Sequence, residues 1–322
     1  MKITFVAWVR YDRRSELLAQ HLGATIHFIY YGQRGKLLQA PVRYLVQALQ
    51  TWRVLCLDRP DVVFVQNPPI FCVLVAFLYG RRHGARYVID SHTAAFLSTK
   101  WRRFLWLHRR LSRVALTTIV HNESQEKIVE RWGCRYCVLA DPVGGYPTGQ
   151  HFPLNGQFNV AVISTFEEDE PLNVVFEAAS RLPEVDFYVT GECNRAAPHM
   201  LAKKPDNCHL TGFLPYDRYV GLLRAVNVIV DLTTRDDTLL CGAFEAVSLG
   251  KPLIVSDWPI LRNYFPLGTV HVPNTAEGIC EGLRRARSEQ TVLQRDILKL
   301  REQLRAEWDQ KFSDLQYLLT ES

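Results

Sequence analysis

Short runs of β-branched and other apolar residues alternate with longer mixed segments along most of the chain. The longer segments carry apolar residues at the three- and four-residue spacing of amphipathic helices, whereas the short runs are continuous, as in strands buried on both faces. This alternation predicts an α/β fold in which helices cover parallel sheets. The predicted strands are 3–7, 25–30, 62–66, 86–90, 117–121, 137–140, 159–164, 186–190, 209–211, 226–232 and 253–256.

Residues 141–156 are rich in proline and glycine and separate the predicted strands into two sets. Segments of this composition are typical of linkers between domains. A chain of 322 residues is also long enough for two cores of ordinary size. We therefore expect two domains with similar parallel sheets, one over residues 1–150 and the other over residues 157–322.

The charged residues are distributed unevenly between these halves. Residues 1–150 contain 21 Lys and Arg against 9 Asp and Glu, a net charge of +12, which leaves 17 against 24, or −7, for the remainder. The excess in the first half predicts an anionic partner, either nucleic acid or an acidic membrane surface. The sequence has no recognition-helix, zinc-finger or aromatic RNA-binding pattern, so we expect no nucleic-acid partner.

The eight cysteines lie scattered in apolar stretches, and the apolar start of the chain lacks the cleavage site of a signal peptide. We therefore expect reduced thiols and a cytoplasmic location. The longest apolar stretch, residues 70–79, is well short of the roughly 20 residues that a membrane-spanning helix needs. Any contact with a membrane is expected to be peripheral, on its cytoplasmic face.

Small and polar residues follow several predicted strands, at the edge where open parallel sheets bind their ligands. In the first half these strand ends hold Asn67, the pair Asp90 and His92, and Asn122. A neighbouring carboxylate and imidazole are suited to proton transfer. Each residue also has a structural interpretation, His92 as a buried or capping histidine and the two asparagines as turn residues.

The loop and short helix before the last predicted strand have the pattern of an anion-binding site. A polar loop that contains Arg235 and Thr238 follows a strand, and Cys241 and Gly242 then open a predicted helix. Free amides at a helix N-terminus bind phosphate. Glu245 lies one turn further, where its carboxylate can reach ribose hydroxyls, although a carboxylate there also complements the helix dipole.

With these residues, the second half resembles the group 1 glycosyltransferases, whose donor domain carries a signature of Glu, seven residues, Glu-Ala and Gly-x-Pro. Phe244 to Pro252 is similar to the second part of that signature, and Thr190-Gly191-Glu192 and Thr211-Gly212-Phe213 precede it in the order those enzymes show. The resemblance implies the GT-B fold, in which two Rossmann-like domains face a central cleft and the last helix, about residues 295–320, returns to the first domain. It implies an enzyme that needs no metal and binds a nucleotide-sugar donor, such as a GDP- or UDP-sugar. The donor-binding residues expected on this basis are Thr165, Gly191, Glu192, Arg235, Thr238, Cys241, Gly242 and Glu245.

The first half resembles a narrower set, the β-1,4-mannosyltransferases that extend chitobiosyl-diphospho-dolichol. The similar residues are Val65 to Pro69, Ile89 to His92 and the Arg14-Ser15 pair. This resemblance implies a lipid-linked acceptor that carries a polyprenyl diphosphate. The residues expected on the acceptor side are His92 and Asp90 in catalysis and Asn67 and Asn122 in binding.

Two positions depart from the group 1 pattern. Thr238 is aligned with the first signature glutamate, which in the family touches the transferred sugar, and Thr165 to Glu168 replaces the Arg and Lys that many members place against the diphosphate. The acidic run from Glu167 to Glu170, ahead of Pro171, is typical of a helix start. We expect this run to hold no metal.

Two other functions are compatible with these residues. A nucleotide-sugar 2-epimerase uses the same two-domain fold without an acceptor, and a catalytically silent GT-B subunit would only bind nucleotide or recruit a partner. A threonine in place of the first signature glutamate, Thr238, is compatible with a catalytically silent subunit. The basic first half, in contrast, has no evident use in an epimerase. Glycosyl transfer to a lipid-linked or membrane-associated glycan is therefore the expected function.

Residues 100–113 predict a helix that would bind the surface of a membrane. Read as one helix, the segment places its apolar side toward the core and surrounds Trp106 with arginines on the other side. A tryptophan among arginines is typical of an interfacial helix on anionic lipid, although a solvated helix face with one exposed aromatic is the alternative. The residues expected at the membrane are Arg102, Arg103, Trp106, Arg109 and Arg110.

Overall fold

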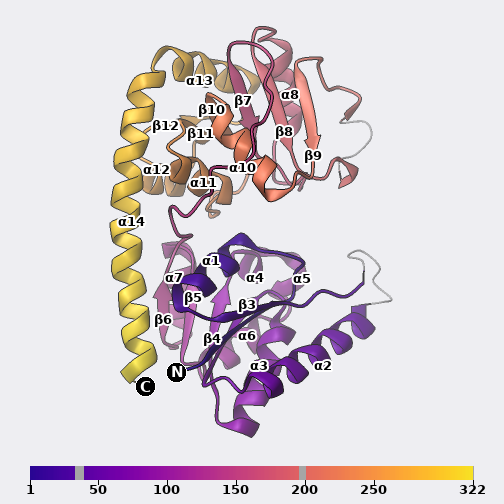
Figure 1. The fold of residues 1–322 in the computed structure, drawn as a ribbon, viewed down its shortest axis with the longest axis vertical. Coiled ribbons are helices and arrows are strands. Elements are labelled where there is room, and N and C mark those ends of the chain that lie inside the picture. The colour runs from indigo at the N-terminus through magenta and orange to yellow at the C-terminus, as the bar shows by residue number, and fades with distance from the viewer. Residues whose placement is uncertain (33–39, 196–200, 322) are drawn as a thin grey trace. The chain divides into compact units, whose positions relative to one another are not determined.

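The computed structural model describes residues 1–32, 40–195 and 201–321. It divides into two compact units, which we call the first unit (Met1–Pro142 with Trp308–Ser322) and the second unit (Val143–Glu307). Each unit is built around one six-stranded parallel sheet with helices on its faces (Figure 1). The predicted α/β fold with two parallel sheets is confirmed.

The sheet of the first unit has the strand order β2-β1-β3-β4-β5-β6. The chain forms β2 on one side of β1 and then crosses to the other side for β3. The reversal leaves a crevice beyond the carboxyl ends of β1 and β3, where sheets of this topology bind ligands. The strands are β1 Ile3–Ala7, β2 Thr25–Phe28, β3 Val62–Asn67, β4 Arg86–Ser91, β5 Thr117–Val120 and β6 Tyr136–Val138.

Helices cover both faces of this first sheet, because side chains alternate between the faces along each strand. Phe5 of β1 packs in a cluster with α1 and the last turns of α14, whereas Val6 packs in a cluster with α2, α3 and α6. Trp308 and Leu315 of α14 are buried in the former cluster. The helices are α1 Arg13–Leu22, α2 Ala40–Asp58, α3 Ile70–His83, α4 Ala94–Leu97, α5 Thr99–Arg102, α6 Leu105–Ser112, α7 Glu123–Arg131 and α14 Gln290–Glu321.

The sheet of the second unit has the order β12-β11-β10-β7-β8-β9. Its reversal lies between β7 and β10, which are hydrogen-bonded neighbours. The strands are β7 Asn159–Val162, β8 Asp186–Thr190, β9 Cys208–Gly212, β10 Val228–Asp231, β11 Leu253–Ser256 and β12 Thr269–Val272. The helices that lie wholly in this unit are α8 Leu172–Ser180, α10 Tyr216–Ala225, α11 Cys241–Leu249, α12 Pro259–Tyr264 and α13 Ala276–Ser288.

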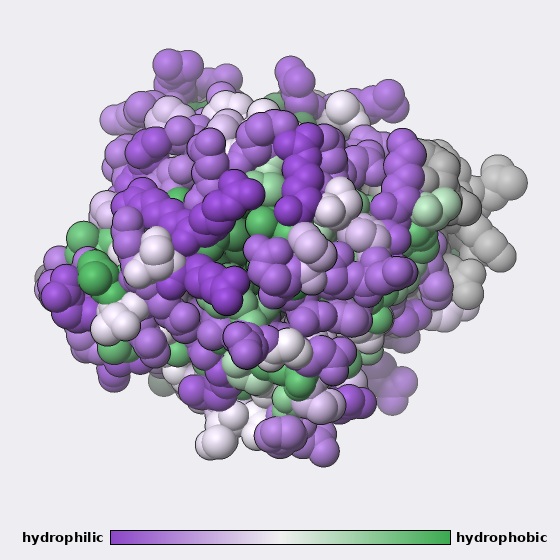
Figure 2. Space-filling model, turned by 90° about the horizontal axis from the view of Figure 1, so that it is seen from above, coloured by the Kyte–Doolittle hydropathy of each residue, from purple (hydrophilic) through white to green (hydrophobic). Residues whose placement is uncertain are grey.

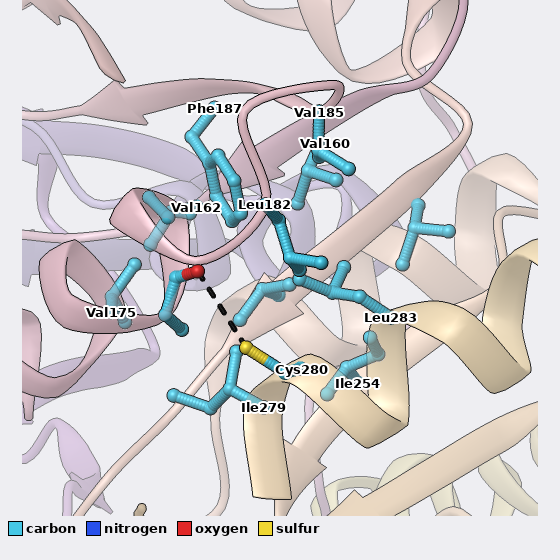
Figure 3. Packing of buried hydrophobic residues seen from close by; sticks show 14 of the residues in the cluster. Val160, Val162, Val175, Leu182, Val185, Phe187, Ile254, Ile279, Cys280 and Leu283 are labelled. Carbon is cyan, nitrogen blue, oxygen red and sulfur yellow. Dashed lines mark hydrogen bonds between the residues drawn. The ribbon is translucent and has the colours of Figure 1, made fainter. Parts of the chain in front are cut away.

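The core of the second unit forms where α8 and α13 pack on one face of this sheet (Figure 3). Val160 and Phe187 point from β7 and β8 toward Leu283 of α13 and its neighbours, and all three are buried. The Cys280 thiol lies 3.6 Å from the carbonyl oxygen of Ala178, so this cysteine joins α13 to α8. This packing stabilises the sheet from its face, so the loops at the strand ends remain available to form a binding site.

Two predictions of local structure are wrong. The sequence reading missed β12, because a four-residue strand interrupted by His271 gives too short an apolar run. The segment 100–113 is not one helix: α5 ends at Arg102 and α6 begins at Leu105. Several predicted strands are also longer at their carboxyl ends than the observed ones, because the loop residues that follow them are apolar.

The surface view shows a mainly hydrophilic face with small, scattered hydrophobic patches (Figure 2). Within the described parts of the chain, no helix combines the length and the apolar character needed to cross a bilayer.

Candidate functional site

A buried ionic network lies at the carboxyl edge of the first sheet. Asp12 caps α1 by accepting a 2.8 Å hydrogen bond from the Ser15 amide, and this cap places Arg14 in the first turn, pointing at the sheet. The Arg14 guanidinium donates to Asp90 at 3.1 Å and to Asp141 at 2.7 Å. It also donates to the carbonyl oxygen of Leu139 at 2.8 Å. Arg14 is only 5% exposed and Asp90 is fully buried, so this cation is the main charge that compensates the two carboxylates.

The network lowers the pKa of both carboxyl groups. Burial by itself would raise the pKa of Asp90, but Arg14 and then His92 outweigh it and hold that pKa well below its usual range. The pKa of Asp141 is lowered in the same way, mainly by Arg14. Asp90 is therefore a carboxylate at neutral pH, at the end of β4 and within reach of two imidazole rings.

Two histidines approach Asp90 from different strand ends. Nε2 of His92 lies 3.2 Å from one Asp90 oxygen, and Nε2 of His121 lies 3.5 Å from the other. Burial would lower the pKa of His92, but the Asp90 carboxylate raises it overall. Burial, and then Arg14, lower the pKa of His121 to about 4. The site therefore pairs a histidine whose pKa a carboxylate raises with one whose pKa burial lowers.

This geometry suits proton transfer better than metal binding. The ligand atoms of Asp90, His92 and His121 lie within 4.8 Å of one another, a spacing that could hold a cation. However, the Arg14 guanidinium already bonds to the same carboxylate, and a metal there would face a buried positive charge. A His92 ring oriented by Asp90 is the arrangement that a general base requires.

The sequence identified only part of this network. It singled out Asp90 and His92 at a strand end, and the structure brings them together. It did not select His121, although this residue ends the next predicted strand and precedes Asn122. It noted Arg14 only as part of a resemblance, because nothing local joins that arginine to Asp141, 127 positions later.

The two asparagines expected on the acceptor side make internal hydrogen bonds. The Asn122 side chain caps α7 by accepting from the Gln125 amide at 3.0 Å. The Asn67 amide nitrogen lies 3.1 Å from Nε2 of His108. Both asparagines are almost fully buried, so their evident role is to hold the strand ends, and a binding role stays a prediction.

A second group of polar residues lies at the switch point of the second sheet, in the loop after β7. The Glu170 carboxylate accepts hydrogen bonds from the amides of Thr165 and Phe166, each at about 2.9 Å. It also accepts from the hydroxyls of Ser164 at 2.5 Å and Thr165 at 2.7 Å. Phe166 has a left-handed backbone, with φ of 59°, which turns its amide toward this carboxylate. The loop thus wraps around an internal anion.

The neighbouring strand presents a second internal carboxyl group, at the N-terminus of α11. The backbone amides of Gly242 and Ala243 donate to the Asp231 carboxyl group at the end of β10. A Cβ atom at Gly242 would lie 2.4 Å from an Asp231 oxygen, so glycine permits this approach. Burial, then Glu170 and Glu245, raise the pKa of Asp231 well above its usual value. The predicted anion site is thus occupied by the chain's own carboxyl group.

Two other predicted donor residues lie near this point. Glu245 accepts a short hydrogen bond from the Tyr219 hydroxyl, so α10 holds its carboxylate in place. The Thr238 hydroxyl is buried and has no hydrogen-bond partner within the described residues, which leaves it available to a ligand. Counting back seven intervening residues from Glu245 reaches Asp237, so the alignment of Thr238 with the first signature glutamate is wrong by one residue.

The remaining predicted donor residues surround the same strand ends. Gly191 has a φ of 104°, and a Cβ atom there would lie 2.2 Å from the carbonyl oxygen of Ser164, so only glycine fits. Arg235 pairs with Asp169 at 3.2 Å, which ties the loop after β10 to the loop after β7. Glu192 and Cys241 are exposed beside these loops.

Comparison with known sequence families finds a similarity over part of the chain. Residues 173–311 match the family model described as glycosyl transferase-like. No curated protein sequence matches the chain at a significant level.

Solved structures share the fold over nearly the whole chain. A sucrose-phosphate synthase from Thermosynechococcus elongatus superposes with a TM-score of 0.75 at 13% identity, covering 100% of this chain and 99% of that one. HepE from Anabaena in complex with UDP-glucose gives 0.70 at 12% identity, covering 98% and 100%. A putative UDP-N-acetylglucosamine 2-epimerase from Listeria monocytogenes gives 0.63 at 13% identity, covering 92% and 91%. Residues 173–311 are therefore similar to a glycosyl transferase-like domain, and the chain has the two-domain GT-B fold of these structures.

Proposed function

We propose that the protein transfers a sugar from a nucleoside-diphosphate sugar to a lipid-linked glycan acceptor. In this proposal the second unit binds the donor and the first unit binds the acceptor. The observation that carries it is the buried Arg14, Asp90 and His92 network at the ligand-binding edge of the first sheet.

The proposed step requires one proton acceptor. Nδ1 of His92 has no hydrogen bond within the described residues, while Nε2 faces Asp90. Nδ1 would take the proton of the acceptor hydroxyl as its oxygen bonds to the anomeric carbon of the donor. The bond from that carbon to the diphosphate oxygen breaks, and the nucleoside diphosphate leaves with the electron pair. Asp90 would stabilise the imidazolium that forms, which agrees with the raised pKa of His92.

The donor side of the proposal rests on the family match and on polar groups at the switch point of the second sheet. The free Thr238 hydroxyl and the fixed Glu245 carboxylate are suited to hydroxyl groups of a sugar or ribose. Solved relatives of this fold bind UDP and UDP-glucose, which favours a nucleotide sugar here. The mannosyltransferase resemblance of the first half makes GDP-mannose one of the donors to test.

The proposal places the enzyme peripherally on the cytoplasmic face of an anionic membrane, where such an acceptor would lie. Trp106 is 64% exposed on α6, and Arg102, Arg103, Arg109 and Arg110 are exposed around it. All five side chains remain exposed although the segment is broken between α5 and α6. A tryptophan ring at headgroup level with arginines against anionic lipid is the expected mode of contact.

The proposal can be tested with a panel of radiolabelled nucleotide sugars. Each is incubated with the protein in the presence and absence of polyprenyl-diphosphate acceptors. Labelled sugar recovered in the lipid phase would support it. Conversion of the donor to its 2-epimer without acceptor would instead establish the epimerase that one solved relative suggests. Binding with neither product would establish the catalytically silent subunit.

A further inference from the structure

The first unit contains an apolar groove that the proposed reaction does not use. It has a volume of about 780 Å³ and lies between α3 and α6. Leu74 and Phe77 of α3, Leu107 of α6 and Ala115 form its lining. All four side chains are only partly buried, so the groove is an open trough of hydrocarbon. An apolar groove that is open to solvent is a typical shape for a site that binds a ligand or a partner.

Two arginines lie on the rim of this groove. Arg81 comes from the last turn of α3 and Arg110 from the last turn of α6, and both are exposed. Neither has an acidic partner in the part of the chain that the structure describes. Guanidinium groups with free donors bind phosphate strongly. The groove thus offers a hydrocarbon floor with two free cations at its edge.

The surroundings of the groove have the same character. Residues 40–113, which supply α2, α3 and α6, contain 12 Lys and Arg against 3 Asp and Glu. One of those acids, Asp90, is buried against Arg14. Large apolar side chains are exposed nearby: Leu78 at 49%, Trp106 at 64% and Val114 at 60%. Exposed apolar side chains within an excess of positive charge complement an anionic lipid surface.

The groove is separate from the candidate active site. It is lined by Ala85 to Tyr87 and by Ala115 and Leu116, at the amino-terminal ends of β4 and β5. Asp90 and His92 lie at the other end of β4, roughly 15 Å away at the usual rise per residue of a strand. A molecule in the groove would therefore not be the sugar acceptor.

We propose that this groove binds one molecule of an anionic glycerophospholipid. An acyl chain lies along the floor formed by Phe77, Leu107 and Ala115, and the phosphate lies between Arg81 and Arg110. A second copy of the chain is the weaker candidate, because it would bring two strongly basic surfaces together. The inference is independent of the proposed transferase reaction, and it adds a defined lipid site to the surface contact of Trp106.

The test uses a lipid that stays monomeric in solution. Titration of the full chain with dihexanoyl phosphatidylglycerol, followed by calorimetry, should show saturable binding of one molecule per chain. Dihexanoyl phosphatidylcholine should bind at least 10-fold more weakly, because its headgroup is neutral overall. Glycerol 3-phosphate should also bind at least 10-fold more weakly, because it has no acyl chain.

Two variants locate the site, and a third serves as a control. The double variant Arg81→Glu with Arg110→Glu should lower the affinity at least 10-fold. Ala115→Trp fills the groove without changing charge and should do the same. Arg131→Glu alters an exposed arginine of α7, which does not line the groove, and this variant should bind the lipid like the wild type. A melting temperature within a few degrees of the wild type would show that each variant is folded.

Several results would overturn the proposal. They are the absence of saturable binding, equal affinity for glycerol 3-phosphate, or unchanged binding in folded Ala115→Trp. Self-association of the wild type that Ala115→Trp abolishes, without lipid binding, would assign the groove to a second copy. None of these measurements involves sugar transfer, so a failure here leaves the proposed transfer reaction untouched.

Discussion

Both sheets reverse their strand order beside their first strand, but they differ in the charges held at that point. In the first unit a buried cation, Arg14, joins two carboxylates and orients a histidine. In the second unit backbone amides hold two carboxyl groups, those of Glu170 and Asp231, and no buried arginine is present among the described residues of that edge. The same backbone framework therefore supports a proton-transfer network in one unit and two amide-bound carboxyl groups in the other.

The two edges differ in whether backbone amides or a buried side chain hold the carboxyl groups. Free amides at a switch point suit any anion, and a carboxylate of the same chain satisfies them as well as a phosphate does. A buried guanidinium instead demands its own carboxylates and fixes them in place. We infer that the first edge is preorganised, whereas the second must release an internal carboxyl group to bind an anionic ligand.

Replacing Arg14 by Ala should give the largest effect, because it leaves Asp90 and Asp141 buried without their cation. Loss of one partner from a buried ion pair costs about 3–5 kcal/mol in free energy of unfolding, which urea denaturation would measure. Arg13→Ala is the matched control. Its ion pair with Glu16 is partly exposed and should be worth at most about 1 kcal/mol. Equal losses in the two variants would contradict the importance of the buried network.

His121 of the first unit and Asp231 of the second unit should contribute to the pH dependence of stability in opposite directions. His121 has a lowered pKa of about 4 in the folded chain, so its contribution to stability is present above about pH 6.5 and is lost as the pH falls toward 4. The free energy of unfolding should fall by at most about 3 kcal/mol from this group, since each unit of pKa shift corresponds to about 1.4 kcal/mol. His108, whose burial lowers its pKa to about 3, acts in the same direction, whereas His92 opposes it. Asp231 has a raised pKa, so its contribution is greatest at low pH and falls as the pH rises.

Melting temperatures at pH 7 and pH 5 would show these contributions through two variants. His121→Gln should reduce the fall in melting temperature on acidification, because its neutral side chain does not titrate. Asp231→Asn should increase that fall, because the stabilisation that Asp231 gains on protonation is lost. The same pH dependence in both variants and the wild type would contradict the assignment of these groups.

Replacing His92 by Ala should lower turnover about 100-fold, or about 2.7 kcal/mol, once a donor and acceptor are identified. The affinity for the donor should not change, because His92 lies in the first unit. Asp90→Asn should lower turnover in the same direction by weakening the orientation of the His92 ring. The control is His151→Ala, which alters an exposed histidine of the second unit. Wild-type rates in the His92 variant would make that residue purely structural.

Replacing Glu170 by Ala should have the smallest effect of these substitutions. It should strengthen nucleotide binding, whereas the others weaken stability or turnover. The amides of Thr165 and Phe166 lose their internal anion, so UDP or GDP should bind about 10-fold more tightly, a change of about 1.4 kcal/mol. Calorimetry with each nucleotide would measure it. Glu168→Ala removes an exposed acid from the same loop and should leave the affinity nearly unchanged. Weaker binding in the Glu170 variant would instead show that Glu170 holds the loop in its binding shape.

The regular elements could be predicted from sequence because each produces its own local pattern. Val62 to Asn67 forms a continuous apolar run that ends in polar residues, and the observed β3 covers it. Local patterns fail where an element is short, as in β12, or where a helix breaks without Gly or Pro, as between Arg102 and Leu105. The fold class does not depend on such details.

The candidate site could be predicted only where chemistry-bearing residues adjoin a strand end. Asp90 and His92 meet that condition, whereas the bond from Arg14 to Asp141 joins residues at opposite ends of the first unit's main segment. The acids before Pro171 were expected to mark a helix start, and α8 does begin at Leu172. Glu170 nevertheless turns back onto Thr165, because the left-handed backbone at Phe166 directs an amide toward it. Propensities of single residues do not encode such a closed loop.

The place of α14 in the chain has a consequence for biosynthesis. The first unit buries Trp308, Phe312 and Leu315 in the cluster that contains Phe5, yet residues 143–307 are translated before them. At about 5–20 residues per second, this delay is on the order of 10 s. During that time one face of the first sheet has emerged without its cover, in a state prone to aggregation. The nascent first unit, rather than the second, is where we expect chaperones to bind.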